Sequence, residues 1–284
     1  MRERSLWFLF DALPGSLLNA KKMWFRNKPK SLTTLKAHAP HGLFDLHSHV
    51  MPGVDDGARD FEEADAMLDA LCTIGFEKVA CTPHFDCIKG EPSVAVQSGR
   101  IARLRERRGD RKPKVTSGAE SVFDDFFVRR EASGGVPGID GQSIYLVELG
   151  FLPGSVTEGM TERVFRLQAE DKQLLLAHPE RVPDIQRNPE NAERLRRLGM
   201  LMQLDVMSLI GRYGRTAKET ALLLLEKGLI DLAATDLHRL DDTGMLISAL
   251  FALLEWDDAA FERLVSVNPS LVFEGRMEEV GRDA

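Results

Sequence analysis

Short apolar runs alternate with longer amphipathic segments from residue 42 onward. Most of the runs are apolar at successive positions, as expected of strands in a parallel sheet that is covered on both faces. They occupy residues 43–46, 78–82, 114–119, 144–149, 173–177, 201–205 and 230–234. This pattern predicts a series of buried parallel strands.

The segments between the runs have helical patterns with clear ends. Residues 60–74 place apolar side chains at helical spacing and are followed by Gly75, while residues 189–198 and 216–227 are followed by Gly199 and Gly228. Strand and helix in repeated alternation predict a parallel α/β fold. About seven such units favour a closed barrel over an open sheet, a choice that periodicity alone does not decide.

The composition is that of one large intracellular domain. With 284 residues, of which 43% are hydrophobic, the chain can bury a full core. The apolar run at residues 6–10 is far shorter than the ~20 residues of a membrane-spanning helix, and it lacks the features of a secretory signal. The 3 cysteines give no disulfide framework. We therefore expect a cytoplasmic protein without a transmembrane segment.

Charge is unevenly distributed. The formal net charge of −7 disfavours a general nucleic-acid-binding function. Residues 1–40 nevertheless contain eight Lys or Arg and only two acids, Glu3 and Asp11. We therefore predict a basic N-terminal extension (1–40) before the barrel (41–284). Contact with an anionic membrane surface, a flexible tail and a helix docked on the barrel all remain open for it.

Five of the seven histidines lie at or just after the ends of predicted strands. They are His47, His49, His84, His178 and His238. In parallel α/β barrels, active sites form at this end of the strands. Side chains two residues apart on a strand point the same way, so His47 and His49 can reach one ion. Asp236 and His238 repeat this spacing, and in a closed barrel the first and last strands are neighbours.

Several acidic residues lie at the same end of the strands. Asp55 and Asp56 follow the first strand, where one can form a turn before the helix and the other can bind metal. Glu120 ends the third strand, and we interpret it as a bridging ligand rather than a surface residue. Glu148 lies in an otherwise apolar strand, where a buried acid needs a partner. It either orients a ligand or is an ordinary residue at a strand end.

These side chains indicate phosphoester chemistry. Imidazole and carboxylate ligands together suit Mn, Fe or Zn rather than Ca, and ions a few Å apart can activate water for phosphoryl transfer. Arg181 follows His178 closely, and its guanidinium suits phosphoryl oxygens, although a salt bridge with a nearby acid is the alternative. No cysteine has the downstream arginine of a cysteine-dependent tyrosine phosphatase, and no phosphate-binding Gly-Lys-Ser/Thr loop is present.

The motifs together resemble a known superfamily. The sequences DLHSH at 45–49, PGVDDG at 52–57 and TPH at 82–84 resemble the PHP (polymerase and histidinol phosphatase) superfamily. With GAE at 118–120, AHPER at 177–181 and TDLH at 235–238, the chain is similar to the bacterial manganese-dependent protein-tyrosine phosphatases. Those enzymes act on the cytoplasmic tyrosine kinases that control capsule and exopolysaccharide export. The resemblance covers residues 43–272.

The resemblance implies a distorted (β/α)7 TIM-like barrel with three divalent metal ions, Mn being favoured and Fe or Zn being alternatives. It implies that Arg181, Asp56 and His238 are catalytic and that Arg181 contacts the substrate phosphate. The family also tends to have an arginine several residues after the Asp-x-His motif. Here Asp241 and Asp242 occupy that stretch, and Arg239 is the substitute candidate. The implied metal ligands are His47, His49, Asp56, His84, Glu120, His178, Asp236 and His238.

The expected function is hydrolysis of phosphotyrosine by metal-activated hydroxide. The expected partner is a phosphotyrosine protein, in particular the tail of a cytoplasmic tyrosine kinase, with which the chain could lie peripherally at the inner membrane. Two alternatives stay open at this point. The barrel could hydrolyse a small phosphoester such as histidinol phosphate, or it could be a non-catalytic regulatory module.

Overall fold

The structure is a computed structural model that describes residues 31–150 and 152–281. Most of the predicted basic extension, including its apolar run at 6–10, lies outside the described residues. Its last part forms α2 (Leu32–Ala37), which Ser31 caps by accepting a hydrogen bond from the Thr34 amide. Helix α2 packs against α3 (Phe61–Ile74) and α10 (Thr243–Trp256), and Leu35 is fully buried there. This part of the extension is therefore docked on the barrel.

The predicted strands are present, and every pairing between them is parallel. The strand order is β1-β2-β4 in one sheet and β3-β5-β6-β7-β8-β9 in the other. Only two residues separate β2 from β3, and two separate β4 from β5, so each pair continues as one strand and the barrel has seven. The strands are β1 (Leu43–Ser48), β2 (Phe76–Cys81), β3 (His84–Phe85), β4 (Lys114–Ser117), β5 (Glu120–Val122), β6 (Ile144–Glu148), β7 (Gln173–Ala177), β8 (Leu201–Asp205) and β9 (Leu232–Ala234).

The barrel closes between its first and last strands. The His49 amide donates to the Leu237 carbonyl at 3.0 Å, and the Asp236 amide donates to the His47 carbonyl at 3.0 Å. Ser48 and Leu237 form a parallel bridge. The prediction of a closed, distorted seven-stranded α/β barrel is confirmed, and the break of the sheet into two segments is the distortion.

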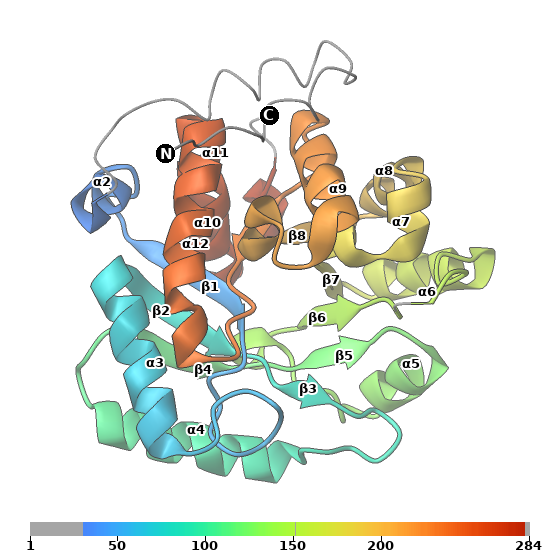
Figure 1. Cartoon of the computed structure of the whole chain (residues 1–284). Helices are drawn as coiled ribbons and strands as arrows, with labels where there is room; N and C mark the ends of the chain where they lie inside the picture. Colours follow the sequence, from blue (N-terminus) through green and yellow to red (C-terminus); the bar gives the residue numbers. More distant parts are fainter. Residues whose placement is uncertain (1–30, 151, 282–284) are drawn as a thin grey trace.

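Helices surround the strands (Figure 1). The predicted helices at 60–74, 189–198 and 216–227 correspond to α3, α8 and α9, and Asp60 begins α3 by accepting a hydrogen bond from the Glu63 amide. The helices whose bounds have not yet been given are α4 (Val94–Arg108), α5 (Asp125–Ala132), α6 (Glu158–Ala169), α7 (Pro183–Arg187), α8 (Glu190–Arg197), α9 (Gly214–Glu226), α11 (Asp258–Glu262) and α12 (Asn268–Phe273).

Two apolar clusters hold this architecture together. One contains Leu46, Leu146, Leu175 and Leu232 and fills the barrel interior, and the larger one lies between the strands and the helices. The filled interior makes the barrel a core rather than a pore, so a ligand site must lie at its open end.

The cysteines and the helix lengths bear on two further expectations from the sequence. Cys72, Cys81 and Cys87 form no disulfide. Across residues 31–150 and 152–281, every helix is too short or too polar to cross a bilayer.

Candidate metal centre

The predicted ligands converge at the carboxyl ends of the strands, with Glu120 at their centre. One carboxylate oxygen of Glu120 lies 2.9 Å from Nε2 of His178. The other lies 3.0 Å from Nδ1 of His84 and 3.4 Å from Nε2 of His47. Glu120 is buried, and it contacts histidines that come from three different strand ends. A carboxylate in this position can bridge two ions.

Asp236 is a second point of convergence. Its Oδ1 lies 3.2 Å from Nε2 of His47 and 3.2 Å from Nε2 of His49. This oxygen is buried and has no hydrogen-bond partner among the described residues. A buried carboxylate oxygen without a donor is costly, and a cation between these atoms would satisfy it. This observation supports a fit between the residues and a metal ion.

Three histidines point the same ring nitrogen, Nε2, toward the cluster, because Nδ1 of each ring contacts an oxygen. Nδ1 of His47 lies 3.2 Å from the Gln203 side-chain oxygen, Nδ1 of His49 lies 2.7 Å from Asp55, and Nδ1 of His238 lies 2.9 Å from the Asp236 carbonyl. A ring that donates its Nδ1 proton to an oxygen leaves Nε2 unprotonated for a metal, which is the usual arrangement of metal-binding histidines.

The outer part of the cluster faces solvent. Oδ1 of Asp56 lies 3.6 Å from Nε2 of His84 and 3.5 Å from Nε2 of His238. The side chains of Asp56 and His84 are 65% and 46% exposed. The ring of His238 stacks on that of His49 at 3.8 Å between centroids. A substrate would therefore reach the site from the side of Asp56.

Possible ligand atoms form three overlapping groups, in each of which all atoms lie within 4.8 Å of one another. Each pair of groups shares one residue: His49, Glu120 or His84. Glu148 belongs to the third group, so the structure brings it into the cluster itself, whereas the sequence suggested either an orienting role or an ordinary residue at a strand end. The groups are His49-Asp56-His84-His238, His47-His49-Glu120 and His84-Glu120-Glu148.

Irregular backbone directs several of these side chains into the barrel mouth. In β1, the three steps from Asp45 to Ser48 face only two steps in β2, so one extra residue is inserted there. This bulge lets consecutive residues Leu46 and His47 both face the barrel interior. His178 and Asp236 have positive φ angles of 36° and 47°. Such conformations are uncommon for non-glycine residues and cluster at functional sites.

The loop after β1 folds back onto the cluster. A Cβ atom at Gly57 would lie 1.9 Å from the His49 carbonyl oxygen, so a larger residue does not fit there. Asp55 accepts a hydrogen bond from the Gly57 amide and also contacts His49. Asp60, rather than Asp55 or Asp56, caps the following helix. Asp55 thus forms the predicted turn and orients His49, while Asp56 faces the outer cluster.

Arg181 lies beside the cluster and contacts the ring of Tyr213, a contact that the sequence did not predict. Its guanidinium donates to Oδ2 of Asp236 at 2.8 Å and lies 3.7 Å from Asp205. Its central carbon lies over the Tyr213 ring, 4.2 Å from the centroid. The salt bridge considered from the sequence is therefore present, with Asp236 as the partner. Arg239 instead donates to the Gly57 carbonyl at 3.0 Å.

The cluster concentrates negative charge. Burial alone would lower the pKa of His47, but the charges of Glu120 and Asp236 raise it to about 9. Burial raises the pKa of Glu148 to about 7, and repulsion from Glu120 acts in the same direction. Burial would raise the pKa of Asp236 too, yet the neighbouring His47 and His49 hold it well below its usual value. The site therefore attracts cations.

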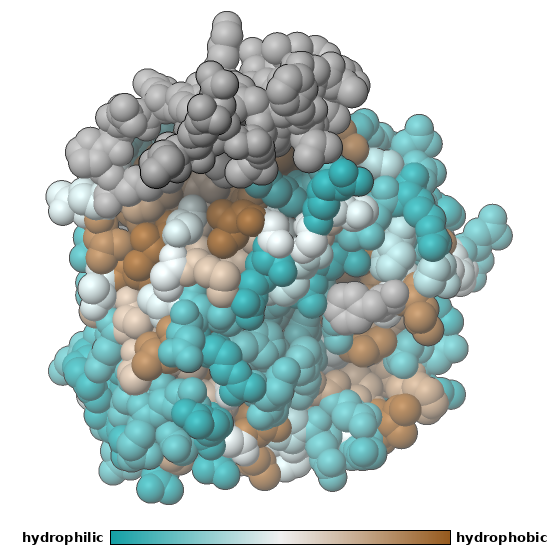
Figure 2. Space-filling view, in the orientation of Figure 1, coloured by the Kyte–Doolittle hydropathy of each residue, from teal (hydrophilic) through white to brown (hydrophobic). Residues whose placement is uncertain are grey.

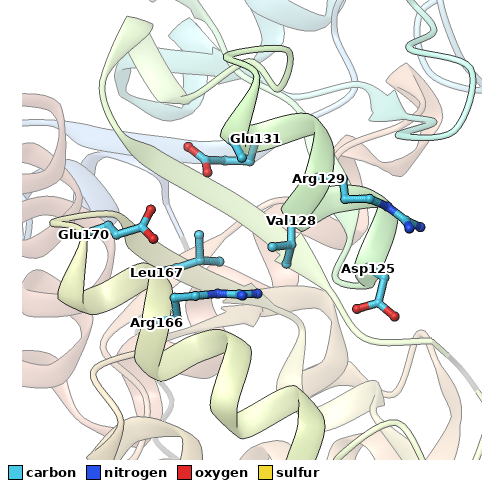
Figure 3. A pocket seen from close by; sticks show the side chains of 8 residues that line it. Asp125, Val128, Arg129, Glu131, Arg166, Leu167 and Glu170 are labelled. Atoms are coloured by element: carbon cyan, nitrogen blue, oxygen red, sulfur yellow. The ribbon is translucent and has the colours of Figure 1, made fainter.

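A groove on the flank of the barrel is separate from this cluster. It lies between α5 and α6, has a volume of about 310 Å³, and none of the predicted ligands lines it (Figure 3). Glu131, one of its lining residues, accepts hydrogen bonds from Tyr145 and Lys172 and so stabilises the packing of α5 on the barrel. The cluster at the barrel mouth remains the candidate site.

The sequence matches known proteins over nearly the whole barrel. Residues 43–273 match the family described as capsular polysaccharide synthesis, CpsB/CapC. The chain is 28% identical over 203 residues to the tyrosine-protein phosphatase YwqE of Bacillus subtilis (strain 168), which covers 69% of this chain and 77% of that protein. It is 22% identical over 211 residues to the tyrosine-protein phosphatase CpsB of Streptococcus pneumoniae, which covers 70% of this chain and 84% of that protein.

A solved structure supports the same fold. It comes from a study of YwqE from Bacillus subtilis and CpsB from Streptococcus pneumoniae, described as unique metal-dependent tyrosine phosphatases. The TM-score is 0.73 at 24% sequence identity, and the match covers 82% of this chain and 94% of the other.

Proposed function

This chain belongs to the CpsB/CapC family of capsular polysaccharide synthesis. We propose that it is a metal-dependent phosphatase that hydrolyses phosphotyrosine on a protein. The convergence of histidines and carboxylates on Glu120 and Asp236 at the open end of the barrel is the observation that supports the proposal most strongly. A cluster of this composition has no need of a protein nucleophile.

We assign this cluster as the site of the metal ions. Divalent cations bound there would lower the pKa of water and neutralise charge on phosphoryl oxygens. Three overlapping groups, each sharing one residue with each of the others, favour three ions. Mixed imidazole and carboxylate donors suit Mn, Fe or Zn, and the resemblance to manganese-dependent phosphatases favours Mn among them. The proposed ligands are His47, His49, Asp56, His84, Glu120, Glu148, His178, Asp236 and His238.

The residues beside the ligands have distinct proposed roles. Arg181 binds the phosphoryl oxygens through its guanidinium, exchanging its contact with Asp236 for the substrate. Asp56 and His238 lie on the exposed side of the cluster, where the tyrosyl oxygen of the substrate would leave. As ligands there they would hold an ion that stabilises the negative charge on that oxygen, and solvent would supply its proton. Arg239 fixes the loop that contains Asp56 through the Gly57 carbonyl, and its direct contact with substrate stays a prediction.

The proposed partner is a cytoplasmic tyrosine kinase with a phosphorylated tail. A tail that extends away from its folded domain can place a phosphotyrosine at the exposed side of the cluster. Association with such a kinase would bring this chain to the inner membrane surface. The family's place in capsular polysaccharide synthesis supports this partner.

Turnover of a phosphotyrosine peptide by the purified full chain tests the proposal. We expect hydrolysis with Mn and much slower hydrolysis of histidinol phosphate and of a phosphoserine peptide. His47→Ala should reduce kcat/KM by roughly 100-fold or more, because the histidine contacts both Glu120 and Asp236. His38→Ala is the matched control, because His38 lies in the segment before the barrel, with Nδ1 bonded to the Thr34 carbonyl. Inactivity with Mn, Fe, Zn and Co alike would exclude the proposed function.

A further inference from the structure

Four large apolar side chains are exposed where neighbouring strands end. We call them the apolar rim: Ile88, Val122, Phe126 and Leu152, which are 62%, 45%, 42% and 78% exposed. Ile88 follows β3, Val122 ends β5, Phe126 lies in the first turn of α5, and Leu152 follows β6. Strands β3, β5 and β6 are consecutive neighbours in the sheet. Figure 2 shows apolar surface on the right-hand side of the molecule, where Figure 1 places β5 and α5.

One residue of the rim, Val122, lies next to the metal centre. Val122 follows Glu120 by two residues on β5, and it pairs with Glu148 of β6 in the sheet register. Side chains two residues apart on a strand project to the same side. Val122 therefore lies next to Glu120 and closer to the end of the strand. Val122 thus lies at the edge of the metal centre, where a residue beside the phosphotyrosine can contact it.

Hydrogen bonds fix the backbone of the rim. Asp124 caps α5 by accepting from the amide of Phe126, and the guanidinium of Arg129 lies 4.8 Å from the centroid of the Phe126 ring. Arg130 of the same helix donates to the Ile88 carbonyl at 3.1 Å and so ties the loop after β3 to α5. Exposed apolar side chains on a fixed backbone are typical of an interaction site, because little order has to be gained on binding.

We propose that the apolar rim binds an aliphatic or aromatic side chain of the substrate polypeptide, close in sequence to the phosphotyrosine. This inference rests on the proposed phosphatase function and adds a determinant of its specificity. An extended peptide advances about 3.3–3.6 Å per residue, so residues one to three positions from the phosphotyrosine can reach the rim. The preferred substrate is therefore a phosphotyrosine peptide with apolar neighbours.

The test compares two phosphotyrosine peptides that differ only beside the phosphotyrosine, one with Leu and one with Ser at the flanking positions. We expect the full-length protein with Mn to prefer the Leu peptide in kcat/KM by roughly five- to tenfold, from partial burial of the added apolar surface. The double substitution Val122→Ser with Phe126→Ser should abolish the preference. Leu152→Ser should reduce it, and this highly exposed position can be substituted without disturbing the core.

Val267→Ser is the matched control. Val267 is 41% exposed, similar to Val122, but its neighbour Ser266 bonds the Gly42 carbonyl just before β1, at the opposite end of the barrel. This variant should keep the preference. An unchanged preference in the Val122/Phe126 and Leu152 variants, or no preference in the unsubstituted protein, would overturn the inference.

A binding measurement separates this inference from the proposed function. Fluorescence anisotropy with the same two peptides, each containing a non-hydrolysable phosphonate in place of the phosphate, reports the preference without turnover. Tighter binding of the Leu peptide that the rim substitutions remove would support the rim even if para-nitrophenyl phosphate and both phosphopeptides were not hydrolysed. Equal binding of both peptides would exclude the rim even if hydrolysis were fast.

Discussion

At the scale of single residues, the position of Arg181 depends on Tyr213. The guanidinium carbon lies over the ring, and Tyr213 in turn bonds Asp205. Tyr213→Leu removes the aromatic face and frees the guanidinium to move. A cation–π contact of about 1–2 kcal/mol corresponds to a loss of roughly five- to thirtyfold in kcat/KM for a phosphotyrosine peptide. Steady-state kinetics at saturating Mn would measure it.

Tyr213→Phe separates the ring from the hydroxyl. It keeps the surface beneath Arg181, so we expect kcat/KM to stay within about threefold of the unsubstituted protein. A Phe variant as impaired as the Leu variant would contradict the stacking role. It would place the contribution in the hydroxyl that bonds Asp205.

The sequence predicts most of the candidate site at this scale, because each histidine follows an apolar run. It does not predict Gln203 as a partner of His47 or Asp205 as a partner of Arg181. Gln203 and Asp205 lie in a run that has the pattern of an ordinary buried strand. The side a strand residue faces depends on register, and a one-residue shift reverses it. The bulge between Asp45 and Ser48 is such a shift, and no local sequence pattern marks it.

At the scale of elements, Asp184 in α7 holds the chain between β6 and α6. Its carboxylate accepts hydrogen bonds from the amides of Gly154 and Val156, each at 2.9 Å, and from the hydroxyl of Ser155. Asp184→Ala leaves these groups without their partner. We expect the free energy of unfolding to fall by about 1–3 kcal/mol, which urea denaturation would measure.

The effect of Asp184 should depend on pH. Burial alone would raise the pKa of Asp184, but the hydrogen bonds from Val156 and Gly154 lower it. A carboxyl whose pKa is lowered on folding contributes stability above its unfolded pKa of about 3.9. That contribution is lost as the pH falls through the folded pKa. The difference in the free energy of unfolding between the unsubstituted protein and Asp184→Ala should therefore be larger at neutral pH than in acid. Substitution of the exposed Asp110 in Asp110→Asn should change the free energy of unfolding little.

The strands were easier to predict than the breaks within them. Continuous apolar runs identified the strands, but the breaks between β2 and β3 and between β4 and β5 depend on tertiary contacts. Pro83 has no amide hydrogen for the sheet. At Gly118, an added Cβ would lie 3.0 Å from the Thr82 side chain, so the two breaks lie against each other. These breaks turn the ends of the strands so that His84 and Glu120 pair.

At the scale of the whole molecule, the cluster ties the first and last strands to the middle of the chain. His47 and Asp236 belong to neighbouring strands at the closure, and Glu120 contacts His47 from across the barrel mouth. Metal ions bound to all three would therefore stabilise the closed barrel as well as promote hydrolysis. Bound ions stabilise the folded state by about 2.7 kcal/mol when the free metal is at 100 times its Kd.

Chelation should therefore lower the melting temperature and abolish phosphatase activity together. For a chain of this size, about 2.7 kcal/mol corresponds to a shift of roughly 5–10 °C. Thermal unfolding with a chelator, and then with excess Mn, would measure this shift beside activity in the same samples. Asp236→Ala should remove most of the response of the melting temperature to Mn, while His38→Ala should keep it. An unchanged melting temperature in protein that binds Mn would mean that the ions do not link the strands across the barrel mouth.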